Sequence, residues 1–278
     1  MKKFTKAIVA ILVLILACSS FTTAFAESEL DQEEILELIM SGDDYLVGDG
    51  VPFDGTTNPD VSLFWTGGGT NHTHQYITSY AFNVLYNDYP SVYNWYIDWG
   101  AITYVLEGSD LPDEDETDNL FAGHFYDPDT GLNYKGTTDT AKSRFLAHFN
   151  NAVAAYQAGN YALAFEKLGR AIHYLEDLNA PHHVANLVAG LSNHTSFEQE
   201  IDANRTRYTA TTASGKYATA IANIPDICAR NAKNNLENAT SAEALPYNGP
   251  WLIAGDYTVP FAMQYVAVIL YQFQQAVS

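Results

Sequence analysis

The stretch His173-Tyr-Leu-Glu-Asp177-Leu-Asn-Ala-Pro181-His-His183 dominates this sequence, and His194-Thr-Ser-Phe-Glu198 follows it closely. If both segments are helical, His173 and Asp177 lie at positions i and i+4 on one helix face, and His194 and Glu198 have the same spacing. Imidazole and carboxylate are ligand types that suit zinc, and a helix holds such pairs rigidly enough to fix a coordination geometry. The stretch therefore predicts two pairs of metal ligands.

A single histidine on a helix is more often a hydrogen-bonded core or surface residue than a metal ligand. Here, however, His173, His182, His183 and His194 fall within 22 positions and are interleaved with acids. This concentration favours a metal site over coincidence.

The residues around this stretch predict helices. Residues 141–177 have the apolar spacing of two antiparallel helices joined at Gly159-Asn160. No alternating pattern suggests a sheet, so the predicted fold class is all-α, a helical bundle in a single domain. Further helices are expected, with prolines at their boundaries: 72–87, 90–106, 138–158, 161–178, 194–206, 214–224, 226–238 and 258–276, bounded by Pro90, Pro112, Pro181, Pro225 and Pro260.

Residues 1–26 read as a secretory signal peptide. Three lysines precede an apolar run, and Ala24-Phe-Ala26 has the form of a cleavage site. The alternative is a lipoprotein attached at Cys18. No later segment is expected to be long enough to span a bilayer. With the signal removed, Cys228 is the one remaining cysteine, so the exported protein must be stabilised by its core or by metal rather than by an internal disulfide.

The chain is strongly acidic, with 13 basic and 33 acidic residues and a net charge of −20. This charge disfavours nucleic-acid binding through a basic patch and a general attraction to anionic membranes. If the target carries phosphate, bound cations must supply the positive charge.

Residues 27–64 contain eleven acids and no Lys or Arg, and their second half is rich in Gly, Pro, Asp, Asn and Thr. They are predicted to be an acidic propeptide; a surface extension of the domain is the alternative. The composition changes at Trp65 to aromatic and helix-forming residues, so residues 65–278 are the expected folded domain.

Further candidate ligands lie near the predicted helix ends. His72 and His74 open a helix, and capping with a solvated imidazole explains His72 better than His74. Asp113 is in an acidic segment, residues 110–118, which taken alone would be a solvated turn or a weak calcium site without EF-hand register. His124 accompanies a turn, and His148 in the middle of a helix is most simply structural.

These residues resemble a known family. His173-Tyr-Leu-Glu-Asp177-Leu-Asn-Ala-Pro-His-His183-Val-Ala-Asn186 is similar to the signature of the bacterial zinc-dependent phospholipases C, and Phe121-Ala-Gly-His124-Phe-Tyr-Asp-Pro-Asp-Thr-Gly131 looks like a second family block. The two occur in family order, and the resemblance covers roughly residues 65–278. The sequence departs from the family pattern at Glu176, where a small residue is usual, and at Val184.

The resemblance implies an all-helical enzyme with three zinc ions in one cleft. One ion would be held by Asp113, His124, His173 and Asp177, and another by His183, His194 and Glu198. The third would use His74, a bridging Asp177, and the amino and carbonyl groups of an N-terminal tryptophan, which here can only be Trp65.

That last ligand implies a zymogen. A free amino group at Trp65 exists only if the chain is cut after Phe64, so residues 27–64 would withhold one ligand set until they are removed.

The chemistry that the resemblance implies is hydrolysis of a phosphodiester. Three divalent ions can orient the phosphate, neutralise its developing charge and lower the pKa of a bound water from ~16 to ~7. Asp113 would orient or deprotonate that water. A choline headgroup could lie against Phe121 and be balanced by Glu114, although Glu114 is equally explained as a solvated acid.

The favoured function is therefore that of a secreted phospholipase C releasing diacylglycerol and a phosphorylated headgroup. The expected partners are phospholipid and a transiently engaged membrane surface, with no nucleic acid, and the expected state is a monomer. The alternatives are a secreted zinc nuclease or nucleotidase on the same scaffold and a non-catalytic zinc-binding surface protein.

Overall fold

A computed structural model describes residues 72–242 and 249–278, and within them every regular element is helical. One isolated bridge, between Asp127 and Leu132, is the nearest approach to a strand in this part of the chain. The α-helices are α3 (Thr73–Asp88), α4 (Pro90–Asp98), α5 (Ile102–Asp115), α6 (Asp118–Phe121), α7 (Ala141–Gln157), α8 (Tyr161–Asp177), α9 (His194–Ala203), α10 (Ile224–Asn234), α11 (Leu236–Ala239) and α12 (Pro250–Val277). Short 3₁₀ turns are η1 (Ala122–His124), η2 (His183–Ala185), η3 (Ala189–Leu191), η4 (Arg205–Arg207) and η5 (Ile221–Asn223). The predicted all-α class is confirmed.

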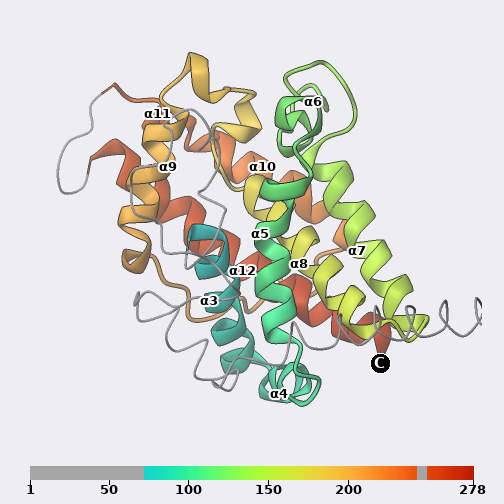
Figure 1. The fold of residues 1–278 in the computed structure, drawn as a ribbon. Helices are drawn as coiled ribbons and strands as arrows, with labels where there is room; N and C mark the ends of the chain where they lie inside the picture. The colour runs from blue at the N-terminus through green and yellow to red at the C-terminus, as the bar shows by residue number, and fades with distance from the viewer. Residues whose placement is uncertain (1–71, 243–248) are drawn as a thin grey trace, which may run out of the picture.

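Helix α8 is central because apolar side chains surround it. Leu168, Ile172 and Leu175 are fully buried, and α8 packs against α7 on one side and α5 on the other. Figure 1 shows these three helices side by side, with the long α12 passing behind them and α3 next to α12. The predicted hairpin of α7 and α8 is confirmed, and Gly159 takes the left-handed conformation (φ 81°) at its turn.

Two glycines bring α5 and α8 unusually close. A Cβ placed on Gly169 of α8 would lie 2.3 Å from the carbonyl oxygen of Val105, and one on Gly108 of α5 would lie 2.4 Å from that of Glu166. These two positions therefore need glycine. The close contact that they allow determines how the C-terminal ends of α5 and α8 lie against each other.

Several predicted boundaries are wrong. The expected helix 90–106 is broken at Gly100 (φ 59°), which separates α4 from α5. Residues 214–220 are not helical but form turns around Gly215 (φ 82°), and regular α-helix begins only at Ile224. Left-handed backbone at a glycine ends a helix, and apolar spacing alone does not reveal it.

Two prolines predicted to mark boundaries lie inside helices instead. Helix α5 continues through Pro112 to Asp115, so much of the acidic segment 110–118 is helical rather than a loop. Helix α12 starts at Pro250 and continues through Pro260. An interior proline costs about 3 kcal/mol, and the burial of Val259, Ala262 and Met263 around Pro260 offsets that cost.

Helix α12 contradicts the expectation that no segment after residue 26 is long enough to span a bilayer. Its 28 residues are long and apolar enough to cross a membrane by length and composition, which the sequence interpretation did not foresee. However, 67% of its most apolar window is buried inside the protein. The helix is therefore accounted for as a core element that packs on α3, α8 and α10.

Candidate metal centre

The last turns of α8 carry the first two candidate ligands. His173 Nε2 lies 3.4 Å from Asp177 Oδ2, as the i, i+4 spacing predicts, and both side chains are fully buried. His173 Nδ1 lies 2.7 Å from the carbonyl oxygen of Ser109. A carbonyl can only accept, so Nδ1 carries the hydrogen of this bond and Nε2 is the nitrogen that faces Asp177.

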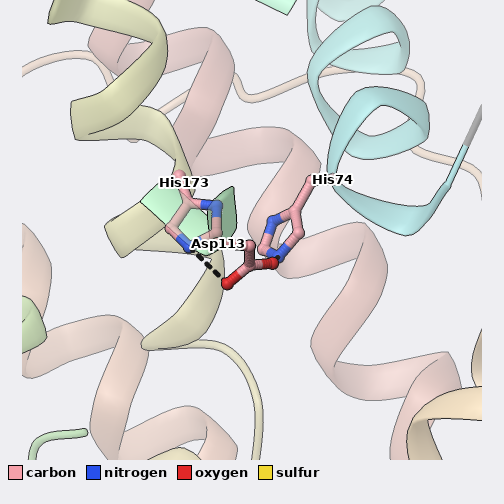
Figure 2. A group of neighbouring side chains, drawn as sticks. All are labelled: His74, Asp113 and His173. Carbon is pink, nitrogen blue, oxygen red and sulfur yellow. Dashed lines mark ion pairs between the residues drawn. The ribbon is translucent and has the colours of Figure 1, made fainter. Parts of the chain in front are cut away.

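Helices α3 and α5 add two more groups from distant parts of the sequence. Asp113, near the end of α5, places Oδ1 3.5 Å from His173 Nε2 and Oδ2 3.9 Å from His74 Nε2. The rings of His74 and His173 stack with their centroids 4.2 Å apart. Figure 2 shows the three side chains converging, with the carboxylate of Asp113 between the two imidazoles.

His124 joins the same cluster from the turn η1. Its Nδ1 lies 3.0 Å from Asp177 Oδ2, 3.1 Å from His173 Nε2 and 3.6 Å from Asp113 Oδ1. His124 is fully buried although it follows an exposed segment. One nitrogen of His124 therefore faces two carboxylates and one imidazole at once.

A second cluster forms where η2 meets α9. Glu198 Oε1 lies 2.7 Å from His194 Nε2 and 3.3 Å from His183 Nε2. His183 Nδ1 is 2.9 Å from the carbonyl oxygen of His124 and 3.4 Å from Asp177 Oδ1. Asp177 thus lies between the two clusters, with one carboxylate oxygen toward each.

The donor atoms form three groups, each with its ligand atoms within 4.8 Å of one another. The groups are His74–Asp113–His173, His124–His173–Asp177 and His183–His194–Glu198. His74 is grouped with Asp113 and His173, whereas the resemblance had paired it with Asp177. Mixed nitrogen and oxygen sets of this kind suit zinc.

Buried carboxylate oxygens indicate that these groups fit cations. Both oxygens of Asp113, and Oδ1 of Asp177, are buried and accept no hydrogen bond. In residues 72–242 and 249–278, the ion pairs of Asp113, Glu176 and Asp177 are all with histidine, none with Lys or Arg. Buried anionic groups need compensating charge, and divalent cations would supply it here.

The histidine pKa values also favour metal binding. Burial, reinforced by the neighbouring His173, lowers the pKa of His74 well below 6.5, and burial lowers that of His194 to about 4. These imidazoles are therefore in the neutral form that metals require. Burial opposes charge on His173 too, but Asp177 and Asp113 raise its pKa to about 9. A proton on His173 compensates the negative charge of Asp177 and Asp113 in the absence of metal, and a divalent cation would compensate the same charge.

The structure thus brings together eight of the nine predicted ligands, and the ninth, Trp65, lies outside the described residues. Of the predicted headgroup residues, Phe121 is half-buried with its ring centroid 5.6 Å from that of His124, and Glu114 is exposed on α5. Phe121 ends a run of three left-handed residues, Asn119–Phe121.

The histidines not predicted as ligands have other partners. His148 Nε2 lies 3.1 Å from Glu116 Oε2, and its ring stacks on Tyr174. His182 stacks on His194 at 5.0 Å and contacts Asn193. His72 Nδ1 lies 3.6 Å from Asp202.

In the sequence, Glu176 is noted only as a departure from the family pattern, next to the predicted ligand Asp177. In the structure its side chain is fully buried and contacts His74 across the boundary between α8 and α3. The available signal was a second acidic residue directly before Asp177, where the family usually has a small residue, but its partner could not be read from local spacing.

Comparisons with known proteins find relatives of this chain. A family model described as zinc dependent phospholipase C matches residues 73–249. Phospholipase C of Clostridium novyi is 30% identical over 237 residues, which are 74% of this chain and 59% of that protein. Phospholipase C of Paraclostridium bifermentans is 29% identical over 195 residues, 62% of this chain and 49% of that protein. The chain therefore spans between half and three fifths of the length of these relatives.

The fold is shared with a solved structure, the alpha toxin from Clostridium absonum. The two superpose with a TM-score of 0.66 at 25% sequence identity, covering 80% of this chain and 66% of that chain.

Proposed function

The chain belongs to the zinc dependent phospholipase C family, and we propose that it hydrolyses the glycerol–phosphate bond of phospholipids to give diacylglycerol and a phosphorylated headgroup. The observation that carries the proposal is the set of three adjoining His and carboxylate groups, contributed by α3, α5, η1, α8, η2 and α9. The two relatives of this chain described above are phospholipases C by name.

We propose three zinc ions at these groups, with Asp177 shared between the clusters and Trp65 completing the ligands around His74. His173 belongs to two of the groups, and its Nε2 would bind only one ion. The support is the placement of Asp177, whose two oxygens face different histidines. Zinc bound there would supply positive charge to the phosphodiester and activate water for attack on phosphorus.

Asp113 is the group that we assign to the attacking water. Its side chain is 6% exposed, and neither carboxylate oxygen accepts a hydrogen bond. Burial raises the pKa of Asp113, although His173 opposes the shift. A zinc ion beside Asp113 would counter this shift and keep the carboxylate ionised. The ionised carboxylate can orient the water and take its proton, while the bond between phosphorus and the glyceryl oxygen breaks and that oxygen is protonated.

The test compares three substrates: phosphatidylcholine vesicles, a soluble phosphocholine ester and single-stranded DNA, each with and without a chelator. We expect the two choline esters to be hydrolysed, the DNA to remain intact, and the chelator to abolish the activity. Cleavage of DNA alone would identify the nuclease alternative, and no hydrolysis by a zinc-loaded protein would identify a non-catalytic zinc-binding protein.

We further propose that the enzyme is exported by residues 1–26 and matures by cleavage between Phe64 and Trp65. The support is that His74 is the second residue of α3. Trp65, the proposed second ligand of the same ion, is only nine residues earlier in the chain. Amino-terminal sequencing of the active secreted enzyme should begin at Trp65. Full activity in a form that begins at Glu27 would reject this maturation.

A further inference from the structure

Glu176 connects a candidate zinc ligand to the helix that carries two others. Its Oε2 lies 2.6 Å from His74 Nδ1, and its Oε1 accepts a hydrogen bond of 2.9 Å from the hydroxyl of Thr78. His74 and Thr78 are one turn apart on α3, and both are fully buried, as is Glu176. Both oxygens of the carboxylate are therefore used, and its orientation is fixed from two sides.

His74 differs in this respect from two other histidines of the centre. His173 Nδ1 donates to the carbonyl oxygen of Ser109, and His183 Nδ1 lies 2.9 Å from the carbonyl oxygen of His124. Those acceptors are neutral backbone groups. Of these three, His74 has the shortest carboxylate contact on the ring nitrogen opposite the one that faces its cluster: 2.6 Å to Glu176, against 3.4 Å from His183 Nδ1 to Asp177 Oδ1.

A carboxylate in that position has two physical effects on a ligand. It holds the hydrogen on Nδ1, so Nε2 keeps its lone pair directed toward Asp113, and it makes the ring a stronger electron donor. Burial raises the pKa of Glu176, and the hydrogen bond from Thr78 opposes the shift; a zinc ion on His74 would also favour the ionised form. The ionised carboxylate makes a charge-assisted hydrogen bond, which is stronger than a bond to a neutral carbonyl. The ion that His74 holds would therefore depend on Glu176 more than the ions at His173 and His183 depend on the carbonyl oxygens bonded to those rings.

We propose that Glu176 is a positioning residue of the metal centre, whose carboxylate orients His74 and strengthens its bond to one zinc ion. The inference rests on the proposed zinc occupancy of the His74–Asp113–His173 group. It assigns a role in metal binding to a residue that contacts neither substrate nor, by itself, the ions.

The test replaces the charge with little change of shape, by Glu176→Gln. Glutamine can still accept from His74 and contact Thr78, so the fold is retained while the anion is lost. We expect the affinity for one zinc ion to fall by about 10- to 100-fold, as measured by competition with a chelator and by mass spectrometry of the metal content. The other two ions should bind as in the wild-type protein.

Asp110 offers a matched control. It is a buried carboxylate of α5 that also contacts α3, through Gln75 Nε2 at 2.5 Å, and the hydrogen bond it accepts comes from that amide rather than from a histidine. Asp110→Asn should leave zinc affinity within about twofold of wild type. Equal losses in Asp110→Asn and Glu176→Gln would mean that any buried charge near α3 matters, and would overturn the proposal.

A second background shows whether Glu176 acts through His74. In a His74→Ala protein, adding Glu176→Gln should cause no further change in the affinity for the remaining ions. A further loss there, or unchanged zinc affinity in Glu176→Gln alone, would reject the assignment. The proposed enzymatic activity is judged separately, because a wild-type protein that binds three zinc ions without hydrolysing lipid would contradict that activity and leave the role of Glu176 standing.

Discussion

His173 contacts the metal centre with one ring nitrogen and α5 with the other, so it connects ligand geometry to helix packing. Its Nε2 lies within 3.5 Å of Asp177, Asp113 and His124 atoms, while Nδ1 is fixed by Ser109. A residue with this many partners in one buried place cannot be replaced without leaving carboxylates uncompensated.

We therefore expect His173→Ala and Asp177→Asn each to lose zinc and to reduce hydrolysis by more than 100-fold. Metal counting by mass spectrometry on purified protein checks the first effect, and phosphocholine release checks the second. His148→Ala is the control, because His148 contacts Glu116 and Tyr174 instead, and it should keep its zinc. Full zinc content in either ligand variant would contradict the assignment.

Phe121 is the residue for which a headgroup effect is expected. Its ring lies 5.6 Å from that of His124, and a quaternary ammonium against an aromatic face gains about 0.5–2 kcal/mol. Phe121→Ala should raise KM for a phosphocholine ester by about two- to thirtyfold while kcat changes little. An equal effect on an ester without a cationic headgroup would show that the ring does not select choline.

At the scale of elements, the contact of α5 with α8 determines whether Asp113 meets His173 and Asp177. That contact depends on Gly108 and Gly169, whose missing side chains allow backbone atoms of the two helices to approach. The helix contact at Gly108 and Gly169 therefore positions the ligands of the metal centre, although neither glycine contributes a ligand.

Gly169→Ala should consequently weaken both the fold and the metal centre. The new Cβ would meet the Val105 carbonyl oxygen at 2.3 Å, so α5 must move, at an expected cost of about 1–3 kcal/mol. Urea unfolding measures the stability, and chelator competition measures the zinc affinity. Gly190→Ala is the control, since nothing lies within 4 Å of a Cβ at that position, and it should behave as wild type.

Glu116, the residue that follows α5, joins this helix to α7 and α8. Its carboxylate accepts hydrogen bonds from Arg170 and Tyr174, both at 2.8 Å, and lies 3.1 Å from His148. Burial alone would raise the pKa of Glu116, but the bonds from His148, Tyr174 and Arg170 outweigh burial and hold the pKa far below 4.5. The folded state therefore favours the ionised form.

From this shift we expect Glu116→Gln to lower the free energy of unfolding by about 1–3 kcal/mol at pH 7. A lowered pKa stabilises the fold above the ordinary value of 4.5, and the benefit declines as the pH falls below it. The difference in free energy of unfolding between wild type and variant, measured with urea, should therefore decrease as the pH falls from 5 to 3. A gap independent of pH would show that the charge of Glu116 contributes nothing.

At the scale of the whole molecule, zinc would act as a cross-link between segments far apart in the chain. The three groups draw on α3, α5, η1, α8, η2 and α9, and Cys228, the one cysteine in the described residues, is free. Metal that binds only the folded state stabilises it by mass action.

Chelation should therefore lower the melting temperature as well as abolish activity. For three ions we expect a decrease of more than 10 °C, measured by thermal unfolding with and without a chelator, and recovery when excess Zn²⁺ is added back. Unchanged melting with complete metal removal would mean that the helices alone set the stability.

Much of this molecule is visible in its sequence. The pairs His173/Asp177 and His194/Glu198 follow from local helical spacing, and apolar periodicity indicated the α7–α8 hairpin and the all-α class, because a helix repeats every 3.6 residues wherever it lies. Assignment of Asp113, His124 and His74 to one centre came from the family resemblance rather than from spacing.

Only the tertiary structure decided how these parts meet. It placed His74 beside Asp113 and His173, extended α5 through Pro112, and directed Glu176 toward His74 rather than toward solvent. The physical reason is that these contacts join residues 39 to 102 positions apart, and those between α5 and α8 depend on the close approach of the two helices at Gly108 and Gly169. Local spacing carries no information about which distant side chain a buried carboxylate will face.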